Sequence, residues 1–142
     1  MSEENKRISR SVVEEIFNRG NLDIVDEVVD PGYVGHDPAS PEEIRGPEGL
    51  KQLAQGYRSA FPDIQVTVDE QLAEGDRVAT RWSARGTHQG ELFGIQPTGK
   101  QTTVTGLTID RYSGGKIVES WDNWDTFGLM QQLGVVPEQA RA

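Results

Sequence analysis

Apolar residues recur every three or four positions in the N-terminal part of the chain, which is the spacing of one face of an α-helix. The first such segment carries its apolar side chains at Ile8, Val12, Ile16 and Phe17. Gly20 then ends this helix. A second apolar face covers residues 22–29, with Asn21 as its N-cap, and stops before Pro31. The pattern predicts two helices that form a hairpin.

The next segment alternates between extended and helical signals. Residues 33–38 end in Asp37-Pro38 and indicate a short extended piece, and the Pro- and Glu-rich residues 39–43 indicate an exposed loop. Pro47 is typical of the first turn of a helix, and apolar residues at helical spacing follow it as far as Phe61. We therefore expect a third helix over residues 47–61.

From residue 64 onward the apolar period changes from about 3.6 residues to 2, the signature of half-buried strands. The alternation predicts one β-hairpin over residues 64–85, with its turn at 74–76. A second hairpin follows, with strands at 102–112 and 116–124. Residues 126–133 then form a closing helix.

Helices followed by a four-strand antiparallel meander, with no βαβ crossover, predict an α+β domain. We expect a single domain over residues 1–136 and a loose tail at 137–142. A strongly twisted sheet is not covered by one helix, so the helical layer should lean across a concave face and leave a cone-shaped pocket.

Composition narrows the classes of function. Among 142 residues there is no cysteine, which excludes disulfides, thiolate metal sites and a cysteine nucleophile. The formal net charge of −9 disfavours nucleic acid and anionic membranes as partners. The N-terminus lacks the apolar core of a signal peptide, so we expect a cytoplasmic protein. Only two histidines are present, which excludes a three-histidine zinc site and leaves a mixed histidine/carboxylate site as the alternative to our expectation of no metal.

The segment from Lys116 to Asp125 is the richest in chemistry. On a strand, Asp122 and Asp125 point to opposite faces, and one of these faces must be the pocket. A carboxylate beside indole rings in a partly dry cavity has a raised pKa and can act as a general acid/base. Asp125 also stands where the closing helix begins, and an aspartate there can instead cap free amides. Spacing leaves both roles open.

Other side chains also have two interpretations. His36, next to a bend, is either a hydrogen-bonded structural histidine or a donor in the pocket. Trp82, Tyr57 and Phe61 are either core residues or part of the cavity wall. Arg111 can contact a substrate oxygen or serve as a solvated cross-strand partner.

At these positions the chain resembles the SnoaL-like polyketide cyclases, or ester cyclases, of the NTF2-like superfamily. The segments that carry the resemblance include Tyr33-Val34-Gly35-His36-Asp37-Pro38, Phe61-Pro62-Asp63, Gly86-Thr87-His88, Phe93-Gly94-Ile95-Gln96-Pro97-Thr98-Gly99 and Trp121 with Asp125. The resemblance implies an NTF2-like cone, a curved antiparallel sheet packed against N-terminal helices, and a homodimer formed through the sheet. It also implies an intramolecular aldol ring closure that needs no metal or organic cofactor.

In this family an aspartate of the last strand is the general acid/base, and the Trp-x-x-x-Asp pattern assigns that role to Asp125, with Asp122 as the second choice. His36 matches the family's histidine after the second helix and should face the same pocket. The expected substrate-binding residues are Trp121, Asn123, Trp82, Tyr57, Phe61, Arg111 and His88. The expected substrate is a small hydrophobic carbonyl compound, and the reaction is a ring closure or a related isomerisation or dehydration. A module that binds such a ligand without chemistry is the alternative.

Overall fold

The computed structural model describes residues 2–136, so the predicted tail at 137–142 lies outside the described residues. The first predicted helix is present as α1 (Ser2–Ser11), which continues into the wider π-helical turns of η1 (Val12–Asn18). Gly20 has a φ of 71°, the left-handed conformation that ends a helix. The first element therefore follows its apolar pattern closely.

The second predicted helix is shorter than its apolar face suggested. It consists of the 3₁₀ turn η2 (Leu22–Ile24) and the single helical turn α2 (Val25–Val28), and the Asn21 side chain does not cap it. Val29 already begins strand β1 (Val29–His36), which contains Pro31. Strand pairing overrides local helix signals here, because β1 lies inside a sheet whose neighbouring strand comes from far along the chain.

The sheet has six strands in the order β2-β1-β6-β5-β4-β3. Besides β1, its strands are β2 (Ile44–Arg45), β3 (Gln65–Glu74), β4 (Arg77–Thr87), β5 (Gln101–Ser113) and β6 (Lys116–Trp124). The meander from β3 to β6 is antiparallel as predicted, but β1 pairs in parallel with β6. The expectation of a purely antiparallel sheet of four strands is therefore wrong. Periodicity identifies strands, but it does not show that two segments about 85 residues apart will pair.

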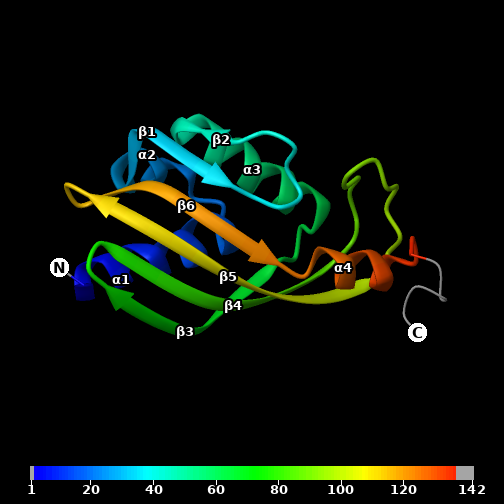
Figure 1. The fold of residues 1–142 in the computed structure, drawn as a ribbon. Coiled ribbons are helices and arrows are strands. Elements are labelled where there is room, and N and C mark those ends of the chain that lie inside the picture. Colours follow the sequence, from blue (N-terminus) through cyan, green and yellow to red (C-terminus); the bar gives the residue numbers. More distant parts are fainter. Residues whose placement is uncertain (1, 137–142) are drawn as a thin grey trace.

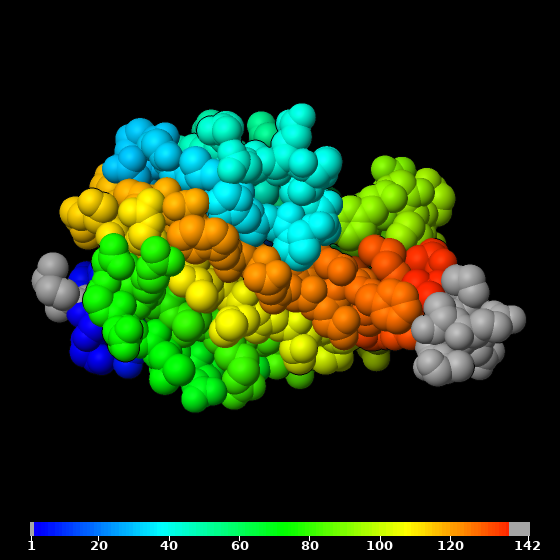
Figure 2. Space-filling view, in the orientation of Figure 1, coloured from blue at the N-terminus to red at the C-terminus, as the bar shows by residue number. Residues whose placement is uncertain are grey.

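Within residues 2–136, helices cover only one face of the sheet. Figure 1 shows α1 and α3 (Gly46–Ala60) behind the strands and α4 (Thr126–Leu133) beside the end of β6. Figure 2 shows the opposite face, where β3 to β6 form one continuous surface that no helix covers in this view. The layers are those of an α+β domain.

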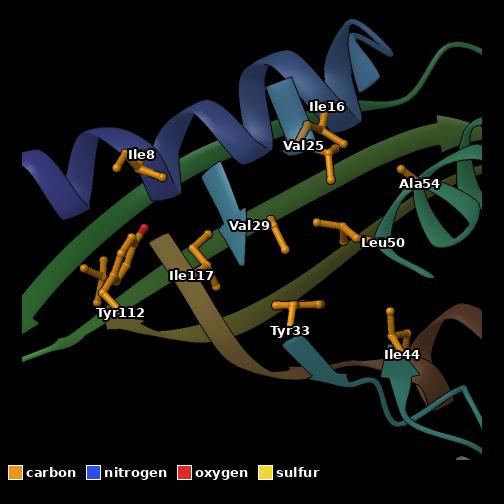
Figure 3. Packing of buried hydrophobic residues seen from close by; sticks show 11 residues of the cluster. Ile8, Ile16, Val25, Val29, Tyr33, Ile44, Leu50, Ala54, Tyr112 and Ile117 are labelled. Atoms are coloured by element: carbon orange, nitrogen blue, oxygen red, sulfur yellow. The ribbon is translucent and has the colours of Figure 1, made fainter. Parts of the chain in front are cut away.

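The main core lies between α1, α3 and the sheet. Figure 3 shows Ile8 and Ile16 pointing from the helix toward Val29, Ile117 and Tyr112 of the strands. A smaller apolar cluster around Phe61, Leu129 and Leu133 joins the end of α3 to α4. None of the helices within residues 2–136 is long and apolar enough to span a bilayer.

Candidate active site

A cavity of about 150 Å³ lies between the concave face of the sheet and the helices. Apolar side chains form most of its walls, with Val12 and Phe17 from η1, Leu50 from α3 and Trp124 from β6 among them. Its polar groups come mainly from the strands and include Asp37, Thr80, Thr108, Asp110, Ser120 and Asp122. This arrangement, apolar walls with a few polar groups in the floor, is typical of a small-molecule site.

Asp122 lies in the cavity floor on β6, and its carboxyl group is held in place by a short chain of hydrogen bonds. Thr108 Oγ1 donates to Asp122 Oδ1 at 2.5 Å, and Trp82 Nε1 donates to Thr108 Oγ1 at 3.0 Å. Because the indole N–H occupies the Thr108 oxygen as a donor, the threonine proton is directed to Asp122. The chain therefore fixes Oδ1 as an acceptor.

The environment of Asp122 suits proton transfer near neutral pH. Burial raises the pKa of Asp122 to about 7, against the lowering effect of the Thr108 hydrogen bond, and the charge of Asp37 raises the pKa further. A carboxyl group with this pKa exists in both protonation states at physiological pH, as a general acid/base requires.

Trp82 reaches Thr108 because the neighbouring strand has no side chain at Gly106. A Cβ atom at position 106 would overlap the indole ring of Trp82 and approach Trp124 Cβ at 2.8 Å. Gly106 pairs directly with Trp82 across β4 and β5. Glycine at this position thus allows the ring to lie across the sheet and donate to Thr108.

Asp37 is a cavity residue that our sequence reasoning did not identify. It is only 8% exposed, and it accepts hydrogen bonds from Tyr57 Oη and Trp124 Nε1, each at 3.2 Å, and from Ala39 N at 2.8 Å. Burial and the charge of Asp37 raise the pKa of Tyr57, so the phenol remains a donor. The alternation of Tyr33 and Gly35 along β1 continues to Asp37, the first residue after the strand, and is the signal that places this side chain inward.

The expectation that Asp125 faces the pocket is wrong. Its side chain is exposed and accepts a hydrogen bond from Gly128 N at 2.8 Å, so it caps the N-terminus of α4. Asp125 is also absent from the cavity wall, where Asp122 and Trp124 lie instead. The capping interpretation is the one that the structure supports, and the second choice, Asp122, occupies the cavity.

His36 also lies outside this cavity, contrary to the expectation. It follows Gly35, so its side chain points to the opposite face of the sheet, where the ring stacks on Trp121 with centroids 5.7 Å apart. His36 Nε2 is 2.8 Å from Glu119 Oε2. Hydrogen bonds from His36 and Arg111 lower the pKa of Glu119. The histidine belongs to a hydrogen-bonded cluster with Glu119 and Arg111 on the outer face.

The outer face also holds three other predicted ligand contacts. Arg111 Nη2 donates to Glu119 Oε1 at 3.1 Å, as the cross-strand interpretation requires. Trp121 carries the guanidinium of Arg77 at 5.1 Å from its ring centroid, and Asn123 is exposed. Trp121 and Asn123 line a shallow outer cleft with His36, but none of the three side chains lines the main cavity. All of these positions follow from which face of the strands points toward the main cavity and which points away from it.

One known protein family matches most of this chain. Residues 8–133 match the family model of the SnoaL-like polyketide cyclases. The chain belongs to this family. It is 31% identical over 121 residues to nogalonic acid methyl ester cyclase of Streptomyces nogalater, covering 83% of this chain and 89% of the relative.

Two solved structures show the same SnoaL-like fold. A SnoaL-like protein from Jannaschia sp. CCS1 superposes with a TM-score of 0.87 at 21% identity, covering 96% of this chain and 95% of that one. AclR of Streptomyces galilaeus, described as a candidate hydroxylase, superposes with a TM-score of 0.84 at 33% identity, covering 97% and 89%. Relatives with this fold are thus described with different chemistries, and the reaction has to be inferred from the site.

The remaining predicted contact residues of this SnoaL-like chain either line the cavity or pack behind its wall. Tyr57, Phe61 and Trp82 line the cavity, as the cavity-wall interpretation expected. His88 is fully buried and does not line it. Its Nδ1 accepts from Thr98 N at 3.2 Å, and its ring lies 5.7 Å from that of Phe61, so it supports the wall from behind.

Within residues 2–136, no group of three or more histidine and acidic side chains is arranged to hold a metal ion. The cavity itself contains three aspartates, Asp37, Asp110 and Asp122, each with its own hydrogen-bond partners.

Proposed function

We propose that this protein is a cofactor-independent cyclase that closes a ring by intramolecular aldol addition, with Asp122 as its general acid/base. The observation that carries the proposal is the half-buried Asp122, whose carboxyl group is fixed by Thr108 and has a pKa of about 7 in a mostly apolar cavity. Membership in the SnoaL-like polyketide cyclase family supports the same reaction.

The reaction would proceed in two proton transfers. The carboxylate of Asp122 removes a proton from a carbon next to a carbonyl group, and the resulting enolate carbon attacks a second carbonyl carbon of the same molecule. A new carbon–carbon bond forms, and the second carbonyl becomes an alkoxide. Asp122 returns the proton to this alkoxide, so the product is an isomer of the substrate and the enzyme is unchanged.

The hydrogen bonds at Asp122 assign separate tasks to its two oxygens. Oδ1 accepts from Thr108, whereas Oδ2 has no hydrogen-bond partner within residues 2–136. Oδ2 is therefore the atom that would take up and return the proton. The apolar walls would hold the flexible substrate in a folded shape near the reacting geometry, which is worth much of the rate enhancement in such reactions.

The substrate class we propose is a small hydrophobic compound with at least two carbonyl groups, for which the ester accepted by the Streptomyces nogalater relative is the natural first probe. The experiment incubates wild type, Asp122→Asn and Asp125→Asn with nogalonic acid methyl ester and follows product by liquid chromatography. Loss of a general acid/base typically lowers the rate by about 10²- to 10⁴-fold. We expect this loss in Asp122→Asn only.

The Asp125→Asn variant is the matched control, because it changes the neighbouring aspartate without changing the cavity. Asparagine remains a good N-cap, so this variant should turn over at nearly the wild-type rate. Turnover that survives in Asp122→Asn would refute the assignment of the base. A ligand that binds to wild type but is recovered unchanged would favour the non-catalytic binding module instead.

A further inference from the structure

The inner end of the cavity, next to helix α1, contains a second carboxyl group that the proposed reaction does not use. Asp110 lies on β5, is only 6% exposed, and shares the cavity face with Thr108 two residues earlier. Among the residues that the structure describes, no basic side chain forms an ion pair with Asp110. A buried carboxylate without a cation is strongly disfavoured.

Asp110 belongs to a chain of close oxygen–oxygen contacts that ends on α1. Asp110 Oδ2 lies 2.7 Å from Ser9 Oγ, which lies 2.6 Å from Tyr112 Oη. Tyr112 Oη in turn lies 2.8 Å from the backbone oxygen of Asn5. On its other side, Asp110 Oδ1 accepts from Ser120 Oγ at 2.6 Å. Each such contact needs one hydrogen between its two oxygens.

Counting hydrogens decides the protonation state. If Asp110 is ionised, the three contacts from Asp110 to Asn5 have only the hydroxyl protons of Ser9 and Tyr112 to share. One pair of buried oxygens would then lie within 2.8 Å with no hydrogen between them. If Asp110 is protonated, it donates to Ser9, Ser9 donates to Tyr112, and Tyr112 donates to Asn5. Every contact is then a hydrogen bond.

We infer that Asp110 is a neutral acid in the folded protein, and that the chain Asp110–Ser9–Tyr112–Asn5 is a proton-dependent latch that holds α1 over the inner end of the cavity. Burial also raises the pKa of Asp110, against the hydrogen bonds that Ser120 and Ser9 would donate to its ionised form. The side chains around Asp110 are the titratable Tyr112 of β5, Tyr33 of β1 and Asp122 of β6, and the non-titrating Thr80 of β4 and Ser9 of α1. None of them supplies a positive charge.

The latch affects the cavity in two ways. Ser9 lines the cavity and sits on α1, whose continuation η1 contributes Val12, Val13 and Phe17 to the same wall. Loss of the proton from Asp110 would break the chain and release this wall. A neutral Asp110 also leaves Asp122 without a charged neighbour at the inner end. The inference does not depend on the proposed reaction, because it concerns the folded protein without substrate.

The test compares wild type with Asp110→Asn, because asparagine can donate to Ser9 and accept from Ser120 as the neutral acid does. Unfolding constants of both proteins are measured by urea denaturation from pH 5 to pH 8. The unfolded wild-type chain releases the Asp110 proton above about pH 4, whereas the folded chain keeps it. The ratio of the wild-type unfolding constant to that of the variant should therefore rise, by up to about tenfold per pH unit.

Asp122 is present in both proteins, so its own titration cancels in this ratio. A ratio that stays flat above pH 5, with wild type the more stable protein, would show an ionised Asp110 and overturn the inference. Failure of Asp110→Asn to fold at any pH would also count against it, because the amide is expected to reproduce the hydrogen-bond pattern.

Infrared spectroscopy gives a second measurement that does not need the Asp110→Asn variant. At pH 8 the carbonyl stretch of a protonated carboxyl group should persist in both wild type and Asp122→Asn. Its absence from either protein would overturn the inference.

Hydrogen exchange tests the latch itself, since α1 amides should exchange faster in wild type than in Asp110→Asn once the pH is high enough to ionise Asp110. Equal exchange up to the pH of unfolding would refute the latch.

Discussion

At the scale of single residues, the site depends on how neighbouring groups restrict one another's hydrogens. Thr108 has one hydroxyl proton, and the indole N–H of Trp82 leaves Asp122 as the acceptor for it. Asp110 shows the same principle in a different form, since the number of hydrogens available to Ser9 and Tyr112 fixes its protonation state. Two aspartates of the same cavity thus differ in protonation because their hydrogen-bond partners differ.

Substituting Thr108 should move the pKa of Asp122 in a defined direction. The hydroxyl hydrogen bond lowers this pKa by stabilising the carboxylate, so Thr108→Val should raise it, by about one pH unit. The base would then ionise only at higher pH, and the acid limb of the pH–rate profile should shift upward by the same amount. Nuclear magnetic resonance titration of the Asp122 carboxyl carbon measures the shift directly.

Thr108→Ser is the matched control, because it keeps the hydroxyl and removes only a methyl group. It should restore a titration close to that of wild type. A Thr108→Val protein with an unchanged titration would show that the threonine packs against Asp122 without positioning it.

At the scale of elements, the start of α4 explains why Asp125 matches the family pattern and yet does not line the cavity. The Trp-x-x-x-Asp pattern pointed to Asp125, but the chain leaves β6 at Trp124 and starts α4 at Thr126. Asp125 therefore stands at the junction, where free amide groups of the first helical turn need an acceptor. The helix in turn places Leu129 against the cavity and Leu133 in the second core cluster.

Removing this cap should reduce stability without touching the chemistry. Asp125→Ala should cost about 1 kcal/mol, which corresponds to a fall of about 3 °C in Tm for a domain of this size. Thermal unfolding by circular dichroism measures the change. Asp125→Asn should retain most of the stability, and a loss of turnover in either folded variant would contradict the structural role.

At the scale of the whole molecule, the helices of the described part of the chain pack on one face of the sheet and leave the face seen in Figure 2 uncovered. The uncovered face carries Leu107, which is 43% exposed, beside Trp121 and Ile109, which are paired across β5 and β6. Exposed apolar side chains on a sheet face are typical of a surface that packs against a partner. We propose that a second copy of the chain covers it, as the family resemblance led us to expect.

A charge at the centre of this face should prevent the association. Sedimentation equilibrium of wild type should give twice the chain mass of 15.7 kDa, whereas Leu107→Asp should give the mass of one chain. The control is Leu72→Asp, which places the same charge at the exposed Leu72 on the edge strand β3. A wild-type protein that sediments as a single chain would refute the dimer.

The elements that the sequence predicted best are those held together by neighbours along the chain. The third helix, the two hairpins and α4 follow local periods of 3.6 and 2, and the first hairpin turns within residues 74–76 as predicted. The parts that it missed depend on distant partners. Strand β1 exists because it pairs with β6, and that pairing turns Asp37 inward and His36 outward.

The sequence by itself determined the class of fold, the family and the short set of acidic and aromatic residues from which a site could be built. Only the tertiary structure decided which of them share a cavity. Alternation along β6 separates Asp122 from Trp121, but it does not say which face is concave. That choice belongs to the helices that pack on one side, because burial between α1, α3 and the sheet is what removes Asp122 from water and gives its carboxyl group a pKa near neutrality.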